Sequence, residues 1–331
     1  IIRLRDEWNR DIDIVIEIVA NLIYFLGLIL KYVQRNVSWQ GFRALNNALE
    51  DHWRQYSDPD EKEVMRRCGE ISRLLALAYL IPINVALICF ITTPLIPVVL
   101  DVINPLNESR PRSHPMYTNY IVDSHEYYNL IMLHQWIKSI VSVEAHGFSD
   151  TYYAQLIQHS CTLFAVVECH LERLRKYQPN SRNQRSRKRD DAIYKELSET
   201  VKLHKEAIEF ATVLDSCFSR GLFRLIVFNT LLISCIAVNS MLNFEVGDLN
   251  KGIRMGILYV AFTWHLFYYN FCAQRIIDGS EHVQEAAFQS SWYNIPKKAK
   301  VLIYMMMMRS TRPCKITGFQ VFDLNLEYFA K

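Results

Sequence analysis

The chain has 331 residues, of which 50% are hydrophobic and only 10 are glycine. This composition excludes a disordered chain and is unlike that of an ordinary soluble domain. The net charge is only +3, and the basic residues fall in separate segments rather than on one face, which argues against nucleic acid as a partner.

Five apolar runs are long enough to cross a membrane. They cover residues 14–33, 74–100, 127–143, 222–244 and 253–272. Each is close to the ~20 residues with which a helix crosses ~30 Å of hydrocarbon. A backbone in lipid must satisfy its own hydrogen bonds, and the alternating ten-residue segments of a membrane barrel are lacking. We therefore expect an all-α fold, that of a multi-span helical membrane protein.

The charges of the connecting segments orient these spans. Lys and Arg number seven in 31–67, eight in 173–189 and six in 297–315, against two in 101–126 and one in 245–251. Basic segments stay on the cytoplasmic side, so the two segments with few basic residues, 101–126 and 245–251, should lie outside. Asn107-Glu108-Ser109, a glycosylation acceptor sequence, falls in one of these outer loops.

The third span continues past the point where the membrane should end. Apolar residues recur at helical spacing through 156–174, which predicts a helix about 40 residues long that projects into the cytoplasm. Residues 196–218 repeat this pattern beyond a basic linker. The two extensions predict either an intracellular helical base or a solvated hairpin that only connects the spans.

An ordered series of short motifs runs along the chain. It comprises Tyr120-Ile121-Val122-Asp123, Gln158-His159, His204-Lys205, Cys272-Ala273-Gln274, Trp292-Tyr293, Met305-Met306-Met307-Met308-Arg309, Arg312-Pro313, Gly318-Phe319 and Leu324-Asn325-Leu326-Glu327-Tyr328-Phe329. Each motif alone is weak evidence for any family, but the ordered series resembles the insect odorant receptors, particularly those of ants and wasps. The resemblance covers nearly the whole chain and is most specific at its C-terminal end.

The resemblance implies a seven-span protein with a cytoplasmic N-terminus. It further implies the ligand-tuning subunit of an odorant-gated, non-selective cation channel, formed with co-receptor subunits in the plasma membrane of olfactory sensory neurons. The expected partners are a volatile apolar odorant, the co-receptor, permeating cations and the lipid bilayer. No enzyme activity, cofactor or metal is expected. The chain begins at Ile1 without methionine and stops at Lys331 within an amphipathic segment, so we expect it to be part of a longer receptor.

The same resemblance divides the chain into five parts. We expect transmembrane ligand-binding helices in 1–149, cytoplasmic helix extensions with a basic linker in 150–220, two further spans in 221–275, a cytoplasmic anchor segment in 276–315 and the start of a pore helix in 316–331. The anchor is expected to join subunits through Trp292, Tyr293, Arg309, Pro313 and Phe322.

Candidate ligand contacts follow from depth in the membrane and from side-chain type. They are Tyr24, Phe25, Leu87, Phe90, Ile91, Met132, Trp136, Ile140, Tyr259, Phe262 and Thr263. An odorant needs aromatic and aliphatic walls with few hydrogen bonds. Trp136 is the strongest candidate, because its ring suits an apolar ligand and its N–H requires an acceptor. For each of these residues, lipid contact or helix packing is the alternative.

Three other classes of protein remain open. A gustatory-receptor-like channel would share the fold, although the C-terminal series fits the odorant branch better. A G-protein-coupled receptor would need the opposite orientation, together with Asp-Arg-Tyr and Asn-Pro-x-x-Tyr motifs that do not occur in the sequence. A solute carrier ranks last, because paired broken helices and internal repeats are not evident.

Overall fold

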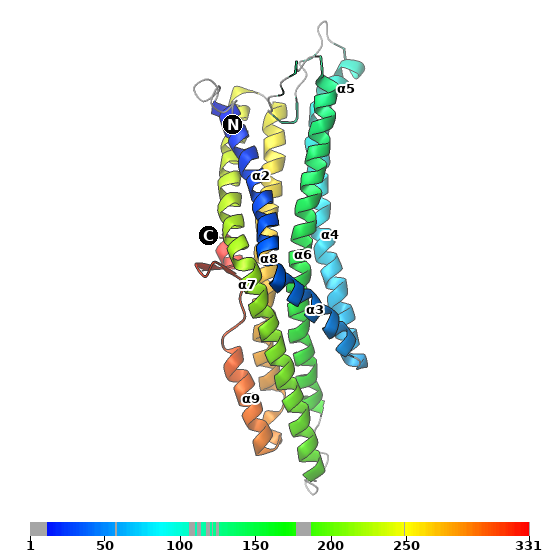
Figure 1. The fold of residues 1–331 in the computed structure, drawn as a ribbon, viewed down its shortest axis with the longest axis vertical. Helices are drawn as coiled ribbons and strands as arrows, with labels where there is room; N and C mark the ends of the chain where they lie inside the picture. Colours follow the sequence, from blue (N-terminus) through cyan, green and yellow to red (C-terminus); the bar gives the residue numbers. More distant parts are fainter. Residues whose placement is uncertain are drawn as a thin grey trace. The chain divides into compact units, whose positions relative to one another are not determined.

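The computed structural model describes residues 12–56, 58–105, 110, 114–116, 120, 122–123, 126–176, 187–247 and 249–330. Nearly all of these residues are helical (Figure 1), so the expected all-α fold class is confirmed. The elements are α2 (Ile12–Val37), α3 (Trp39–Gln55), α4 (Pro59–Thr92), η1 (Thr93–Leu95), α5 (Ile96–Ile103), α6 (Tyr128–Lys176), α7 (Arg187–Val246), α8 (Leu249–Gln289), η2 (Trp292–Asn294), α9 (Lys297–Ser310), β1 (Thr317–Gly318), β2 (Phe322–Asp323) and α10 (Leu326–Ala330).

Four of the five apolar runs each fall on a single helix, α2, α6, α7 or α8, and several of these helices are much longer than their run. Helix α6 has 49 residues, α7 has 60 and α8 has 41. The prediction that the third apolar run continues as a helix well beyond residue 143 is therefore confirmed. Prolines interrupt the second run: α4 ends before Pro94, and the chain resumes as α5 with Pro97 in its first turn. Proline is tolerated in a first turn because the N–H that it lacks has no partner there.

Three helical segments in the described part of the chain are long and apolar enough to cross a membrane. They are Ile14–Val37, Pro59–Ile103 and Arg187–Val246. Only 11% of the apolar stretch in the first and 17% of that in the second is buried, so most of these side chains are free to face lipid. The expected spans 127–143 and 253–272 lie on α6 and α8, which have more polar and aromatic side chains and do not reach the same apolar level.

The chain divides into two compact units. Unit 1 comprises Ile1–Val33, Leu77–Thr151 and Arg224–Tyr268, and unit 2 comprises Gln34–Ala76, Tyr152–Phe223 and Tyr269–Lys331. In unit 1, α7 and α8 form a small apolar core of Leu232, Ile236 and Met255. The side chains that pack against this core are Ala20, Ile23, Tyr24, Leu258 and Phe262.

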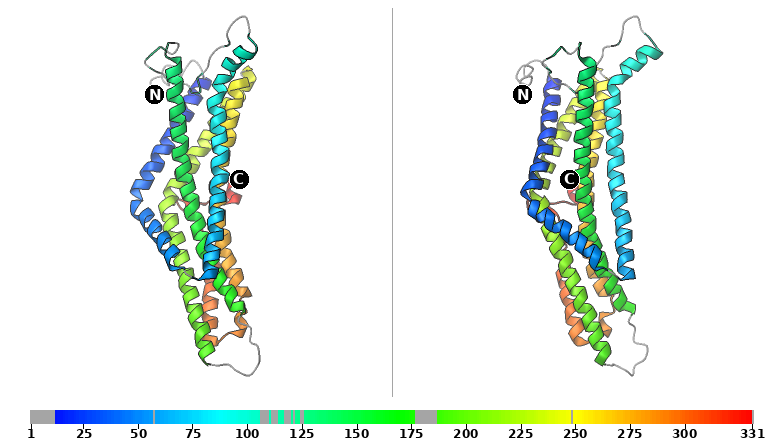
Figure 2. Two further views of the ribbon diagram at one scale, coloured as in Figure 1. Left: turned by 90° about the vertical axis from the view of Figure 1, so that its right-hand side faces the viewer. Right: turned by 45° about the vertical axis from the view of Figure 1, so that its right-hand side comes forward.

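Unit 2 has the denser interior. Along α6, Leu156, Leu163, Val167 and Leu171 are buried at the spacing of one helical face. Helix α9 runs beside the C-terminal half of α8 and the N-terminal half of α7 in both views of Figure 2, and buries Ile303. The apolar residues of both helix extensions are thus packed rather than solvated.

Polar contacts attach the segment Gln34–Ala76 to α6 within unit 2. The imidazoles of His52 and His159 lie 3.0 Å apart, and burial lowers the pKa of His159 to about 3. His170 Nε2 lies 2.8 Å from Glu61, and the Arg173 guanidinium donates to Asp58 at 2.6 Å. These pairs fix α3 and the beginning of α4 against the long helix.

The last part of unit 2 differs from the expectation of a helix beginning near residue 316. Two short antiparallel strands, β1 and β2, come first, with Thr317 opposite Asp323 and Gly318 opposite Phe322. Helix α10 begins only at Leu326.

Candidate ligand site

Aromatic side chains from three helices meet in unit 1. The ring of Tyr24 on α2 stacks on the imidazole of His146 on α6, with centroids 4.9 Å apart. Phe262 of α8 meets the same tyrosine edge-on at 5.9 Å, and Phe25 does so at 5.3 Å. The ammonium of Lys138 lies 4.9 Å from the ring centroid of Phe25, within the range of a cation–π contact. These rings form a largely apolar wall with one cationic edge.

A buried ionic cluster lies next to this wall. The Asp150 carboxylate, which is completely buried, accepts hydrogen bonds from Lys31 Nζ at 2.5 Å, from the Tyr79 hydroxyl at 2.6 Å and from His265 Nε2 at 3.0 Å. The donors come from α2, α4 and α8, and the acceptor from α6. Burial of a carboxylate is tolerated where charge and hydrogen bonds compensate it, as they do here.

Two further side chains complete this cluster, which we call the Asp150 node. Asn229 of α7 and His265 Nδ1 lie 2.7 Å apart, and His146 Nδ1 lies 3.1 Å from Lys31 Nζ. An amide N–H directed at Nδ1 leaves the imidazole proton on Nε2, where it faces Asp150. The node therefore joins α2, α4, α6, α7 and α8 of unit 1 through hydrogen bonds.

Helical spacing explains why the aromatic wall and the node adjoin. Tyr24 and Lys31 are seven residues apart on α2, His146 and Asp150 are four apart on α6, and Phe262 and His265 are three apart on α8. Residues at these separations share a helix face. Each of the three helices thus presents a ring and a polar group to the same side.

The structure brings some of the expected ligand residues together and not others. Tyr24, Phe25 and Phe262 form the aromatic wall. Leu87, Phe90 and Met132 are buried, whereas Ile140 and Tyr259 are exposed by 42% and 41%. Ile91 is half-buried, and the Thr263 hydroxyl donates to the carbonyl of Tyr259 within its own helix.

Trp136 has the property that made it the strongest candidate. Its ring is half-buried, and its Nε1 atom is buried without an acceptor among the described residues. A buried N–H without an acceptor costs about 1–3 kcal/mol. An oxygen atom of a ligand placed beside this nitrogen would recover that energy.

Sequence reasoning missed the residues of the Asp150 node. Four other ionisable side chains lie in or next to the expected spans: Glu17, His134, Lys138 and Glu144. Of these, Glu17 lies 3.9 Å from Lys251, and His134 contacts the Tyr120 hydroxyl at 2.7 Å. The pair His146 and Asp150, four residues apart in a helix that leads out of an apolar run, was the signal available for the node.

The expected subunit-contact residues all lie in unit 2. The Trp292 ring packs on Tyr304 at 5.3 Å, while Tyr293 is 62% exposed. The Arg309 guanidinium donates to the carbonyl of Arg312 at 2.7 Å, next to the half-buried Pro313. Phe322 lies on β2. The glycosylation candidate Asn107 falls outside the described residues.

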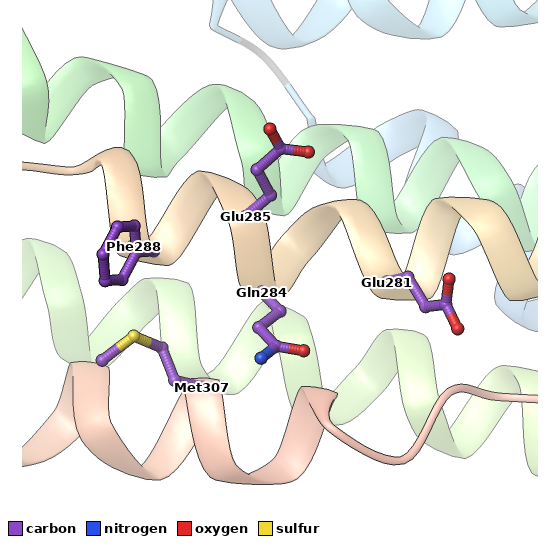
Figure 3. Close-up of a pocket in the computed structure, with 5 residues that line it drawn as sticks. All are labelled: Glu281, Gln284, Glu285, Phe288 and Met307. Atoms are coloured by element: carbon purple, nitrogen blue, oxygen red, sulfur yellow. The ribbon is translucent and has the colours of Figure 1, made fainter.

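A shallow groove also lies in unit 2, between α8 and α9. Figure 3 shows Phe288 opposite Met307, with Gln284 directed toward α9 and the carboxylates of Glu281 and Glu285 along the same stretch of α8. Two carboxylates in an open groove do not make a site for an apolar odorant. Nearby on α6, burial raises the pKa of Glu168 to about 7.

Comparison with known proteins identifies the family. The family model described as 7tm Odorant receptor matches residues 14–331. The chain belongs to the odorant receptor family. This is a family of receptors rather than of enzymes. With its long apolar helices, the odorant receptor chain is a membrane protein.

Individual relatives are distant. The receptor chain is 22% identical to Odorant receptor 22b of Drosophila melanogaster over 231 residues, which cover 65% of this chain and 56% of that protein. It is also 22% identical over 146 residues to the Odorant receptor coreceptor of Ooceraea biroi, covering 44% of this chain and 30% of the co-receptor. The chain thus spans little more than half the length of the first of these relatives.

The fold matches a solved structure, that of the insect olfactory receptor OR5 from Machilis hrabei in complex with eugenol. The TM-score is 0.75 at 15% identity, over 97% of this receptor chain and 79% of the other. At this identity the match establishes the fold.

Proposed function

We propose that this odorant receptor is the odorant-specific subunit of a ligand-gated, non-selective cation channel, whose pore it forms together with co-receptor subunits. Family membership carries the proposal, and the similarity to co-receptors as well as to receptors named for odorants supports it. The protein acts in the plasma membrane of olfactory sensory neurons. Its basic segments face the cytoplasm. The segment 276–315 serves as the anchor, in which subunits meet through Trp292, Tyr293, Arg309, Pro313 and the nearby Phe322.

We place the odorant against the aromatic and aliphatic side chains of unit 1. The observation that favours this placement is the convergence of Tyr24, Phe25 and Phe262. Leu87, Phe90 and Met132 belong to the same unit and are buried. Such walls suit a small, volatile, apolar ligand. The N–H of Trp136, which has no acceptor among the described residues, favours a ligand that carries an oxygen acceptor.

Opening of the channel requires that the odorant bind the open state more tightly than the closed state, since equal affinity shifts no equilibrium. The aromatic wall adjoins the Asp150 node through the stack of Tyr24 on His146 and the contact of His146 with Lys31. A ligand that displaces the Tyr24 ring would therefore act on a cluster that joins five helices of the same unit.

The ligand site is tested with three variants of the complete receptor, expressed with an insect co-receptor and exposed to ketones and to alkanes of equal chain length. Trp136→Phe keeps a ring but removes the N–H, and Trp136→Ala removes both. Ile137→Ala, at an exposed neighbouring position on α6, is the control.

We expect Trp136→Phe to raise the half-maximal concentration of ketones about tenfold, which corresponds to one lost hydrogen bond to a buried donor, and to leave that of alkanes unchanged. Trp136→Ala should weaken both classes. Equal responses of Trp136→Phe and wild type to every active compound would remove Trp136 from the site.

A further inference from the structure

The turn that joins β1 to β2 has an unfavourable backbone. The Val321 N–H donates to the carbonyl of Gly318 at 2.9 Å, and the two residues between them, Phe319 and Gln320, have φ angles of 52° and 58°. Hairpin turns with two positive φ values normally use Asn-Gly or another glycine-containing pair. A side chain with a β-carbon is strained in this region, and such strain persists only where surrounding contacts hold it.

Helix α7 supplies contacts that hold this turn. The Asp215 carboxylate accepts the Thr317 amide N–H at 2.7 Å and lies 3.1 Å from the Thr317 hydroxyl. The Ser219 hydroxyl oxygen accepts the amide N–H of Phe319 at 2.8 Å. The ring of Phe223 lies 6.1 Å from that of Phe319. The three α7 residues are spaced four apart and so form one face of the helix.

The hairpin in turn positions the beginning of α10. The Phe322 ring lies parallel to the Tyr328 ring of α10, with centroids 4.6 Å apart and planes inclined by only 5°. The Phe322 ring also covers Gly318 so closely that a β-carbon there would overlap it. The Leu326 N–H donates to Gln274 Oε1 at 3.3 Å. Movement of the hairpin would therefore displace the first turn of α10.

We propose that residues 317–323 form a strained strap, held by the α7 face of Asp215, Ser219 and Phe223, through which α7 positions the C-terminal helix. Docking of the strap opposes its own backbone strain, which lowers the free energy needed to release it. An element with two accessible arrangements can be shifted by small forces at either end. In the channel proposed above, on which this last step rests, exchange between the two forms accompanies gating.

If residues 317–323 form such a strap, two substitutions should shift the equilibrium between its docked and released forms in opposite directions. Asp215→Ala removes an acceptor of Thr317 and favours release, whereas Gln320→Gly relaxes the turn, because glycine adopts positive φ without strain, and favours docking. Asp215→Asn is a milder form of the first change. Glu209→Gln, at an exposed carboxylate on the same helix that pairs with Lys205, is the control.

The first readout is hydrogen exchange of the Thr317 and Phe319 amides in the complete, purified receptor. We expect exchange about tenfold faster in Asp215→Ala, less so in Asp215→Asn, slower in Gln320→Gly and unchanged in the control. This readout does not depend on channel activity. Exchange that is equally fast in wild type and Asp215→Ala would overturn the strap itself.

The second readout is the half-maximal odorant concentration with co-receptor present. We expect Asp215→Ala and Gln320→Gly to shift it in opposite directions, by about fivefold each. Damage to the fold would shift both variants the same way. A shift in one common direction, or none, would overturn the link to gating, and loss of all current in wild type would instead contradict the proposed channel while leaving the exchange result to decide the strap.

Discussion

Removal of Lys31 from the Asp150 node should destabilise the receptor far more than removal of an ordinary lysine. The Asp150 side chain is 0% exposed and that of Lys31 is 16% exposed. In Lys31→Met the carboxylate keeps the neutral donors Tyr79 and His265 but loses its cation. A buried charge that loses its partner costs about 3–5 kcal/mol of unfolding free energy.

The second half of this prediction is a compensating change. In Lys31→Met/Asp150→Asn both charges are gone, and the Asn side chain can still accept a hydrogen bond from Tyr79. Replacement of a whole buried pair by neutral groups is often nearly neutral, so the double variant should lie within about 2 kcal/mol of wild type and above either single variant. Lys138→Met serves as the control, since that ammonium faces the Phe25 ring, and should cost less than about 1 kcal/mol.

Thermal unfolding of the purified receptor, monitored as the loss of monodisperse protein, measures the stability of wild type, of the two single variants and of the double variant. At roughly 2 °C or more per kcal/mol, Lys31→Met should melt at least ~6 °C below wild type, and the double variant should recover most of that loss. A double variant as unstable as the sum of the two singles would show that Lys31 and Asp150 do not interact. A Lys31→Met variant that melts with the Lys138→Met control would show that the node does not stabilise unit 1.

Two further substitutions test unit 2. Burial raises the pKa of Glu168 from 4.5 to about 7. The folded state therefore binds more protons than the unfolded state between these values, and the contribution to stability is full below about pH 4.5 and is lost as pH rises through about 7. Glu168→Gln should flatten the pH dependence of the melting temperature across this window and raise the melting temperature at about pH 8. Glu199→Gln, at an exposed carboxylate on α7, should keep the wild-type slope. A steep slope retained in Glu168→Gln would assign the effect to another group. Gly318→Ala should lower the free energy of unfolding by about 1–3 kcal/mol, because the added β-carbon forces the Phe322 ring away from Tyr328. Gly69→Ala, with open space around the added atom, is its control in the same melting assay. Equal melting temperatures of the two variants would contradict the close packing at Gly318.

The sequence predicted the helices because their signal is local. Apolar runs and helical spacing of residues such as Leu163 and Leu171 identify a helix and its buried face without knowledge of its neighbours. The length of α6 followed from continued periodicity beyond residue 143. The family could also be inferred from the sequence, because its motifs are short and follow one another in a fixed order along the chain.

The Asp150 node could not be read from the sequence in the same way. Lys31, Tyr79, Asp150 and His265 lie far apart along the chain, and only the packing of their helices brings them together. A different reason explains why the hairpin of β1 and β2 was not predicted from the sequence. Its turn residues are Phe319 and Gln320, where turn rules look for Asn, Asp or Gly, so contacts with α7 rather than local preference determine its conformation.

The candidate ligand residues were chosen from their side-chain type and their depth in the membrane. Tyr24 and Phe262 share an aromatic wall, but Ile140 and Tyr259 reach the surface, because position along a helix gives depth while orientation depends on the neighbouring helices. The role of these residues in odorant binding stays a prediction.

Whole-cell current from the complete receptor, expressed alone and together with an insect co-receptor during exposure to a volatile panel, tests the central claim most directly. The account predicts an odorant-evoked cation current that requires both chains and reverses near the same potential when sodium is exchanged for potassium. The absence of any evoked current from receptor detected at the cell surface with its co-receptor would contradict the assignment of this chain as a subunit of an odorant-gated channel.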